Sequence, residues 1–170
     1  MAATKYVAPV EPNVKILYID SAMSCNRIEI GKGRTITGSG RKFSVPLSEF
    51  EGEFMTPLVS RLLQKRLFIV LDGLTDEQRR MYDCYYGDGE VLENETMFAW
   101  FITAPVETAA AAFAELCPQH RDLVCRRILT SRDEGGPALT RERLTAFNNI
   151  SKADHNGTGL LTDILKEMEV

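Results

Sequence analysis

The spacing of hydrophobic and polar residues changes after Pro46. Before it, residues alternate with the period of half-buried strands, and β-branched and aromatic side chains are frequent. Glycine-rich turns at 31–33 and 38–40 separate the later runs, and proline closes the last one. This part of the chain is expected to form an antiparallel β-meander whose strands cover four segments: 14–19, 27–30, 34–37 and 42–46.

The spacing of apolar residues becomes helical after Pro46. Thr56 before Pro57 has the pattern of an N-cap followed by proline at the first helical position, and Thr75 with Gln78 has that of a capping box. The run 67–71 is apolar throughout and predicts one more buried strand. Helices are expected at 56–66, 75–86, 105–117, 118–130, 140–150 and 160–168, with helical character already from Asn94.

These patterns predict an α+β fold, with an N-terminal antiparallel β-meander followed by a mainly helical C-terminal half. Residues 1–13, with two prolines, are expected to form a flexible arm. Residues 14–134 are expected to form the α+β domain. Gly135-Gly136-Pro137 has the composition of a linker. Residues 135–170 then form a helical hairpin, packed on the domain or on a neighbour.

The composition is that of a globular protein. The chain has 170 residues, of which 44% are hydrophobic and 26% charged. No apolar run approaches the roughly 20 residues that cross a membrane, and we expect neither a transmembrane helix nor a secretory signal. The four cysteines are therefore expected to be reduced and mostly buried.

Charge is distributed unevenly. Residues 1–47 carry seven Lys/Arg and three Asp/Glu, whereas residues 48–100 carry five and eleven. A basic β-hairpin region and an acidic segment suit head-to-tail contact between copies. The alternative is that the two segments neutralise each other within one fold. The net charge of −4 argues against specific nucleic-acid binding.

Three stretches resemble ligand-binding motifs and each lacks one element. The glycines at 31–40 lack the spacing of a phosphate-binding loop. Cys117, His120 and Cys125 lack a fourth zinc ligand, which favours buried cysteines beside a surface histidine. Residues 154–165 match half of a calcium loop, but Leu165 stands where a bidentate carboxylate is required, so a turn between two helices is preferred.

No catalytic motif is recognisable, although a site assembled from distant residues stays open. Only His120 and His155 have the intrinsic pKa of a neutral-pH base, and neither lies in a known nucleophile motif. We therefore expect a protein that is not an enzyme and has no cofactor, metal or small-molecule substrate. The aromatic run 97–102 is interpreted as core, or alternatively as an anchor for a partner.

The segments 33–51, 56–63 and 67–70 together resemble small structural proteins of tailed bacteriophage virions. Such proteins combine a β-meander, a proline-closed strand and a helix that leads into another strand. The resemblance implies a part of the neck, collar, tail-completion, connector, baseplate or head-decoration type, assembled in the host cytoplasm and located in the virion. The resemblance assigns no functional role to any residue of this chain.

The leading hypothesis is therefore an oligomeric neck or tail component, whose partners are its own copies and other virion proteins. The N-terminal arm and the C-terminal helix are suited to lacing neighbours together. The alternatives are a cytoplasmic adaptor that binds a host protein through residues 97–102, or a head-decoration or baseplate protein. The candidate interface residues are Arg27, Lys32, Arg34, Arg41, Lys42, Asp76, Glu77, Asp88, Glu90, Trp100 and Phe101.

Overall fold

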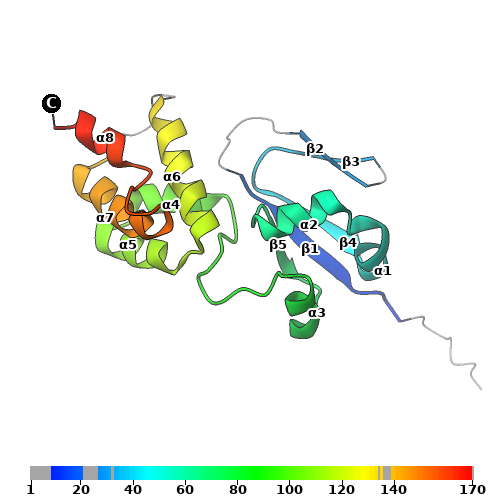
Figure 1. The fold of residues 1–170 in the computed structure, drawn as a ribbon. Coiled ribbons are helices and arrows are strands. Elements are labelled where there is room, and N and C mark those ends of the chain that lie inside the picture. The colour runs from blue at the N-terminus through cyan, green and yellow to red at the C-terminus, as the bar shows by residue number, and fades with distance from the viewer. Residues whose placement is uncertain (1–8, 21–26, 32, 134, 136–138, 170) are drawn as a thin grey trace, which may run out of the picture.

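The computed structural model describes residues 9–20, 27–31, 33–133, 135 and 139–169. It confirms the expected fold class, because antiparallel strands form the N-terminal part and helices form most of the rest (Figure 1). The strands are β1 (Asn13–Tyr18), β2 (Arg27–Ile30), β3 (Arg34–Thr37), β4 (Arg41–Pro46) and β5 (Phe68–Asp72).

The strands do not all pair in chain order, as they would in a consecutive meander. β1 is the central strand of a three-stranded antiparallel sheet with the order β4-β1-β5, while β2 and β3 form a separate hairpin. β1 is fully buried at Val14, Ile16 and Leu17, so its backbone groups need strand partners on both sides. The hairpin buries little beyond Ile30 and Ile36.

The two faces of β1 belong to different parts of the core. Ile16 and Tyr18 pack with the residues of α2 (Pro57–Gln64) and of a π-helical turn, η1 (Phe50–Phe54), which follows the short α1 (Leu47–Glu49). Leu17 and Ile19 point the other way and join the core of the helical half. Because successive side chains point to opposite faces of a strand, β1 contributes to both parts of the core.

The predicted helices are present with bounds close to those expected. Thr56 caps α2, Thr75 caps α3 (Asp76–Met81) and Thr140 caps α7 (Arg141–Ser151) through their side chains, and the capping box of Thr75 and Gln78 is complete. α3 is shorter than expected: it ends at Met81 with Tyr82 as its C-cap, and the next residue, Asp83, has a positive φ of 54° that a helix does not allow. The helices after β5 are α3 (Asp76–Met81), α4 (Thr96–Thr103), α5 (Val106–Glu115), α6 (Pro118–Asp133), α7 (Arg141–Ser151), the 3-10 turn η2 (Lys152–Asp154) and α8 (Thr162–Glu167).

The C-terminal helices pack on the rest of their own chain. α7 lies against α5, where the rings of Phe113 and Phe147 stack with their centroids 4.5 Å apart. Phe101 of α4 meets both rings edge to face. Arg143 of α7 is buried and donates hydrogen bonds to the carbonyls of Phe101 and Ala104 at the end of α4. The guanidinium thus satisfies acceptors that a helix end leaves free.

The first described residues lie at the end of the sheet remote from the helical half (Figure 1). The carbonyl of Pro12 accepts a hydrogen bond from the Leu47 amide, and the carboxylate of Glu11 accepts one from the Ser48 amide. Residues 1–8, most of the expected arm, lie outside the described residues. Among the residues that are described, none forms a helix long and apolar enough to cross a membrane.

Candidate functional site

His120 lies in the core, which corrects the expectation of a surface histidine. Its side chain is fully buried on α6. Nδ1 accepts a hydrogen bond from the Leu92 amide at 2.7 Å, and Nε2 lies 2.7 Å from the Arg66 carbonyl, to which it donates. Burial is the main reason that the pKa of His120 falls to about 4. Both ring nitrogens are occupied, so this imidazole joins three segments and has no lone pair for a metal.

The cysteines beside it are buried thiols. Cys84, Cys117 and Cys125 are free, and burial raises the pKa of Cys84 to about 11 and that of Cys125 to about 12. Thiols of this kind are poor nucleophiles and poor metal ligands at neutral pH, because both roles require the thiolate. Cys25 lies outside the described residues.

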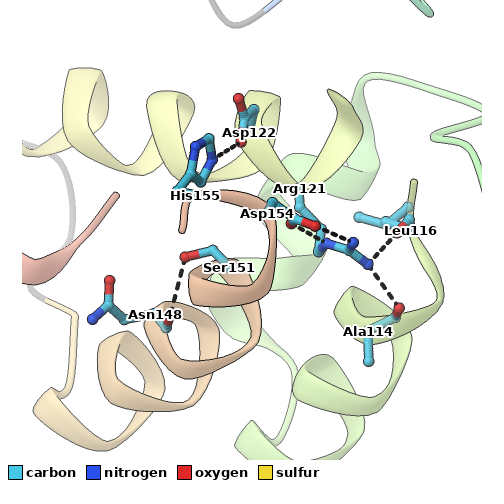
Figure 2. Close-up of polar contacts among 8 residues, drawn as sticks. All are labelled: Ala114, Leu116, Arg121, Asp122, Asn148, Ser151, Asp154 and His155. Atoms are coloured by element: carbon cyan, nitrogen blue, oxygen red, sulfur yellow. Dashed lines mark hydrogen bonds and ion pairs between the residues drawn. The ribbon is translucent and has the colours of Figure 1, made fainter. Parts of the chain in front are cut away.

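The loop that resembles a calcium site has its first carboxylate occupied (Figure 2). Arg121 donates to both oxygens of Asp154, each at 2.7 Å, and reaches the carbonyls of Ala114 and Leu116 with its remaining nitrogen. These hydrogen bonds hold the pKa of Asp154 below its ordinary value. Within the described ranges, no group of three His, Cys, Asp or Glu side chains is arranged to hold a metal ion.

Gly159 is required for packing and not for a calcium turn. A Cβ atom at this position would lie 2.0 Å from Oδ1 of Asn148. Asn148 is buried on α7, and its Oδ1 accepts a hydrogen bond from the Leu161 amide at 2.9 Å. The close approach therefore fixes the connection from α7 to α8 through one buried amide side chain.

His155, the second histidine, pairs with Asp122 at 2.7 Å on the surface beside this loop (Figure 2). The pair joins η2 to α6, next to the contact of Arg121 with Asp154. The four side chains thus tie the loop after α7 to one side of α6. Within the described part of the chain, the hydrogen bond of His155 is made to the carboxylate of Asp122 and not to a hydroxyl or thiol.

The basic candidate residues lie on the β2–β3 hairpin and on β4. Arg27 pairs with Glu29, and Arg34 pairs with Glu49 at 3.0 Å while also reaching the Ser44 carbonyl. Arg41 donates to the carbonyl of Thr37, and both Arg41 and Lys42 are exposed. They line a groove of about 300 Å³ between β3 and β4, together with Thr35, Ile36, Thr37 and Phe43. Lys32 lies outside the described residues.

The acidic candidates follow β5 in the chain, and α3 also contacts η1, where Gln78 donates to the carboxylate of Glu51 at 2.9 Å. Asp76 and Glu77 are exposed in the first turn of α3, which follows β5. Asp88 is exposed, and the carboxylate of Glu90 accepts a hydrogen bond from the Gly87 amide at 2.6 Å. In the order β4-β1-β5, the basic strand and the strand that leads to the acids are the two outer strands.

Only part of the charge is neutralised inside the fold. Lys42 and Asp88 line the same cleft of about 440 Å³, which crosses one face of the sheet. Lys15 and Asp72 form an exposed pair at 3.4 Å. Asp76 and Glu77 have no ion-pair partner within the described part of the chain.

The aromatic run of α4 is divided between core and surface. Phe101 is fully buried and belongs to the core, so its side chain offers no surface to a partner. Trp100 is 39% exposed and rests on Phe101 in an edge-to-face contact. Of the two residues proposed as partner contacts, only Trp100 is accessible.

A buried arginine, which the sequence did not single out, joins the two halves. Arg127 of α6 bonds to the carboxylate of Glu95 at 2.5 Å and to the carbonyl of Asp20 at 2.6 Å. The second oxygen of Glu95 accepts a hydrogen bond from Ser39, whose hydroxyl in turn accepts one from the Asp20 amide. No local pattern marks Arg127, because its partners lie 32 and 107 residues away.

The chain was compared with known proteins. No family model, curated protein or solved structure matches the chain.

Proposed function

We propose that this protein is a non-enzymatic structural component of a multi-subunit assembly, and specifically of a tailed-phage virion. Its place is a neck, collar, tail-completion or connector part that makes head-to-tail contacts with its own copies. The observation that carries this proposal is the position of the charges. The exposed cations Arg41 and Lys42 lie at one edge of the sheet, and the exposed acids Asp76 and Glu77 follow the strand at the other.

This arrangement favours association in one direction. A positive edge and a negative edge on opposite sides of one molecule attract the next copy in the same orientation, whereas two like edges repel each other. Charges that neutralise each other within a chain give no such direction. The structural role further fits side chains that are used for packing, since both ring nitrogens of His120 and both carboxylate oxygens of Asp154 have protein partners.

The direct test is the composition of purified virions together with the mass of the isolated protein. We expect the protein in particles at a fixed multiple of the symmetry of the neck or tail, and oligomers in light scattering. A strictly monomeric protein, even when mixed with other virion proteins, would contradict the proposal.

The second candidate is a cytoplasmic adaptor that binds a host protein. The observation in its favour is the exposed indole of Trp100, since tryptophan is enriched at interaction hot spots. A pull-down from host lysate separates the two functions. One stoichiometric host partner lost on Trp100→Ala, with absence from particles, supports the adaptor.

A further inference from the structure

The two outer edges of the sheet differ in how their backbone groups are satisfied. On β5, the Val70 amide donates to the Tyr86 hydroxyl at 3.4 Å, and the Val70 carbonyl accepts from Arg79 at 2.9 Å. β4, the other outer strand, pairs with β1 on one side, while β3 belongs to the separate hairpin. Within the described part of the chain, the other edge of β4 therefore has no strand partner, and such an edge is a template for one.

The backbone groups at this open edge follow from the alternation of an antiparallel strand. The Ser44 carbonyl accepts a hydrogen bond from Arg34 of β3 at 3.3 Å, so it points away from β1. Lys42 lies two residues earlier in the same strand, and its amide and carbonyl point the same way. Neither group of Lys42 has a hydrogen-bond partner among the described residues. The edge thus presents both donors and acceptors, which is the pattern that an extended peptide matches.

A groove of about 300 Å³ lies along this edge, between β3 and β4. Ile36 and Phe43 give it an apolar lining, and both pack with the core residues of β1 and α2. The remaining lining residues are polar: Thr35, Thr37, Arg41 and Lys42. Ile36 and Phe43 alternate along their strands with Thr35 and Lys42, so an extended segment in the groove meets apolar side chains on one face and polar ones on the other.

The charge at the groove selects an acidic segment. Arg41 and Lys42 are exposed, and neither forms an ion pair within the described part of the chain. The sheet edges of a second copy do not supply the missing acids, because its β4 carries the same two cations and its β5 is closed by Tyr86 and Arg79. A nucleic acid is negatively charged, but its phosphates donate no hydrogen bond to the Lys42 carbonyl.

We propose that the open edge of β4 binds an extended peptide segment of a partner protein in which acidic and apolar residues alternate. The segment lies in the groove as an added strand, and its backbone pairs with the amide and carbonyl of Lys42 and with the amide of Ser44. Its apolar side chains cover Ile36 and Phe43, and its carboxylates pair with Arg41 and Lys42. Backbone pairing supplies affinity, and the two cations supply the preference for acids.

The inference goes beyond the proposed function, because the partner is a different protein and not another copy of this chain. Arg41 and Lys42 also belong to the proposed head-to-tail contact. A bound acidic segment and a neighbouring copy therefore compete for the same two cations.

The test is the binding of synthetic peptides to the full-length protein, measured by fluorescence anisotropy. The probe is a labelled hexapeptide of alternating glutamate and valine. We expect it to bind at least about tenfold more tightly than the same peptide with lysine in place of glutamate, and more tightly than a short oligothymidylate. Equal binding of the two peptides, tighter binding of the oligothymidylate, or no binding at all would overturn the inference.

Methylated peptides separate strand pairing from attraction between charges alone. Two further probes carry an N-methyl group on every second amide, one on the glutamates and one on the valines. Only one of these sets faces β4 in a paired strand, so we expect one of the two peptides to lose about tenfold or more in affinity. Unchanged affinity of both peptides overturns the proposed pairing.

Matched variants locate the binding on the protein. Lys42→Glu reverses a charge in the groove, whereas Lys65→Glu makes the same change at an exposed position after α2. We expect Lys42→Glu to weaken binding of the glutamate peptide by about tenfold or more, and Lys65→Glu to change it less than about twofold. Equal effects of the two variants overturn the inference.

Ser44→Pro removes an outward amide without a change in charge, and proline is tolerated at such edge positions. We expect this variant, once circular dichroism shows it folded, to bind the glutamate peptide at least about tenfold more weakly, and unchanged binding refutes pairing at β4. Oligomers of the wild type that bind no peptide refute the groove and leave the proposed function standing. A monomer that binds the glutamate peptide supports the groove and refutes the function.

Discussion

His120 shows at the scale of one residue how a side chain typical of catalytic sites serves the fold. Its neutral ring accepts from Leu92 and donates to Arg66, and protonation would set the charged ring against the donating Leu92 amide. Its pKa near 4 in the folded chain is below the ordinary value of 6.5, so the unfolded chain binds this proton more readily.

We predict that the free energy of unfolding falls by about 3 kcal/mol through His120 as the pH is lowered from 6.5 to 4. Above pH 6.5 this contribution to the pH dependence vanishes. Urea unfolding at several pH values measures the slope, and His120→Gln, with no titrating ring, is the reference. An unchanged slope in that variant would refute the assignment.

Asp154 allows a test of the cation hypothesis. The side chains of Arg121 and Asp154 are 14% and 9% exposed, so Asp154→Asn leaves the guanidinium largely buried without its charge partner. We expect a loss of about 3 kcal/mol of stability.

Millimolar calcium should leave the melting temperature of the wild type unchanged, because both carboxylate oxygens of Asp154 are occupied. A calcium-dependent rise of several degrees would show a cation site instead.

At the scale of elements, the connection from α7 to α8 depends on the close packing of Gly159 against Asn148. Gly159→Ala places a Cβ atom 2.0 Å from the buried Asn148 side chain, and we predict a loss of about 2 kcal/mol or more. Gly52→Ala is the matched control, because a Cβ at Gly52 meets no atom within 4 Å. The measurement is the melting temperature of both variants. A Gly159→Ala variant that is as stable as Gly52→Ala would contradict this packing.

Local patterns were sufficient to predict most elements. The caps Thr56, Thr75 and Thr140 act over one helical turn, so the sequence next to them predicts where α2, α3 and α7 begin. The pairing of β1 with β4 was not predictable in the same way. It joins residues that are up to 33 positions apart, such as Asn13 and Pro46, and depends on the burial of both faces of β1.

The candidate site was predicted less completely. Residue type and charge indicated the exposed cations on β4 and the acids of α3. The interpretation of the aromatic run as core is confirmed for Phe101, so its inclusion among the interface residues is wrong, and His120, expected at the surface, is buried. Arg127 was missed, since a buried arginine has the same local sequence pattern as an exposed one. Contacts across 107 residues decide its role.

At the scale of the whole molecule, the outer strands of the sheet are β4 and β5. The exposed cations Arg41 and Lys42 lie on β4, and the exposed acids Asp76 and Glu77 follow β5. The hydrogen bonds of Arg127 to the Asp20 carbonyl, of Ser39 to Glu95 and of His120 to the Arg66 carbonyl tie the helical half to the half that contains the sheet. A molecule tied together in this way presents its two charged edges in a fixed relative orientation, as repeated head-to-tail contact requires.

Head-to-tail contact between copies through the charged edges is tested most directly by a charge-swap mixing experiment followed by light scattering. One variant carries Arg41→Glu and Lys42→Glu, which makes both edges acidic, and another carries Asp76→Lys and Glu77→Lys, which makes both edges basic. Arg61→Glu with Lys65→Glu on the exposed side of α2 is the control for net charge. Circular dichroism first verifies that each variant is folded.

Head-to-tail contact through the charged edges predicts that each edge variant alone is monomeric, that an equimolar mixture of the two assembles again, and that the control assembles like the wild type. Lower ionic strength should strengthen the mixed assembly, because exposed charges are screened by salt. Oligomers of unchanged mass in both single variants, or no assembly in their mixture, would contradict head-to-tail contact through the charged edges.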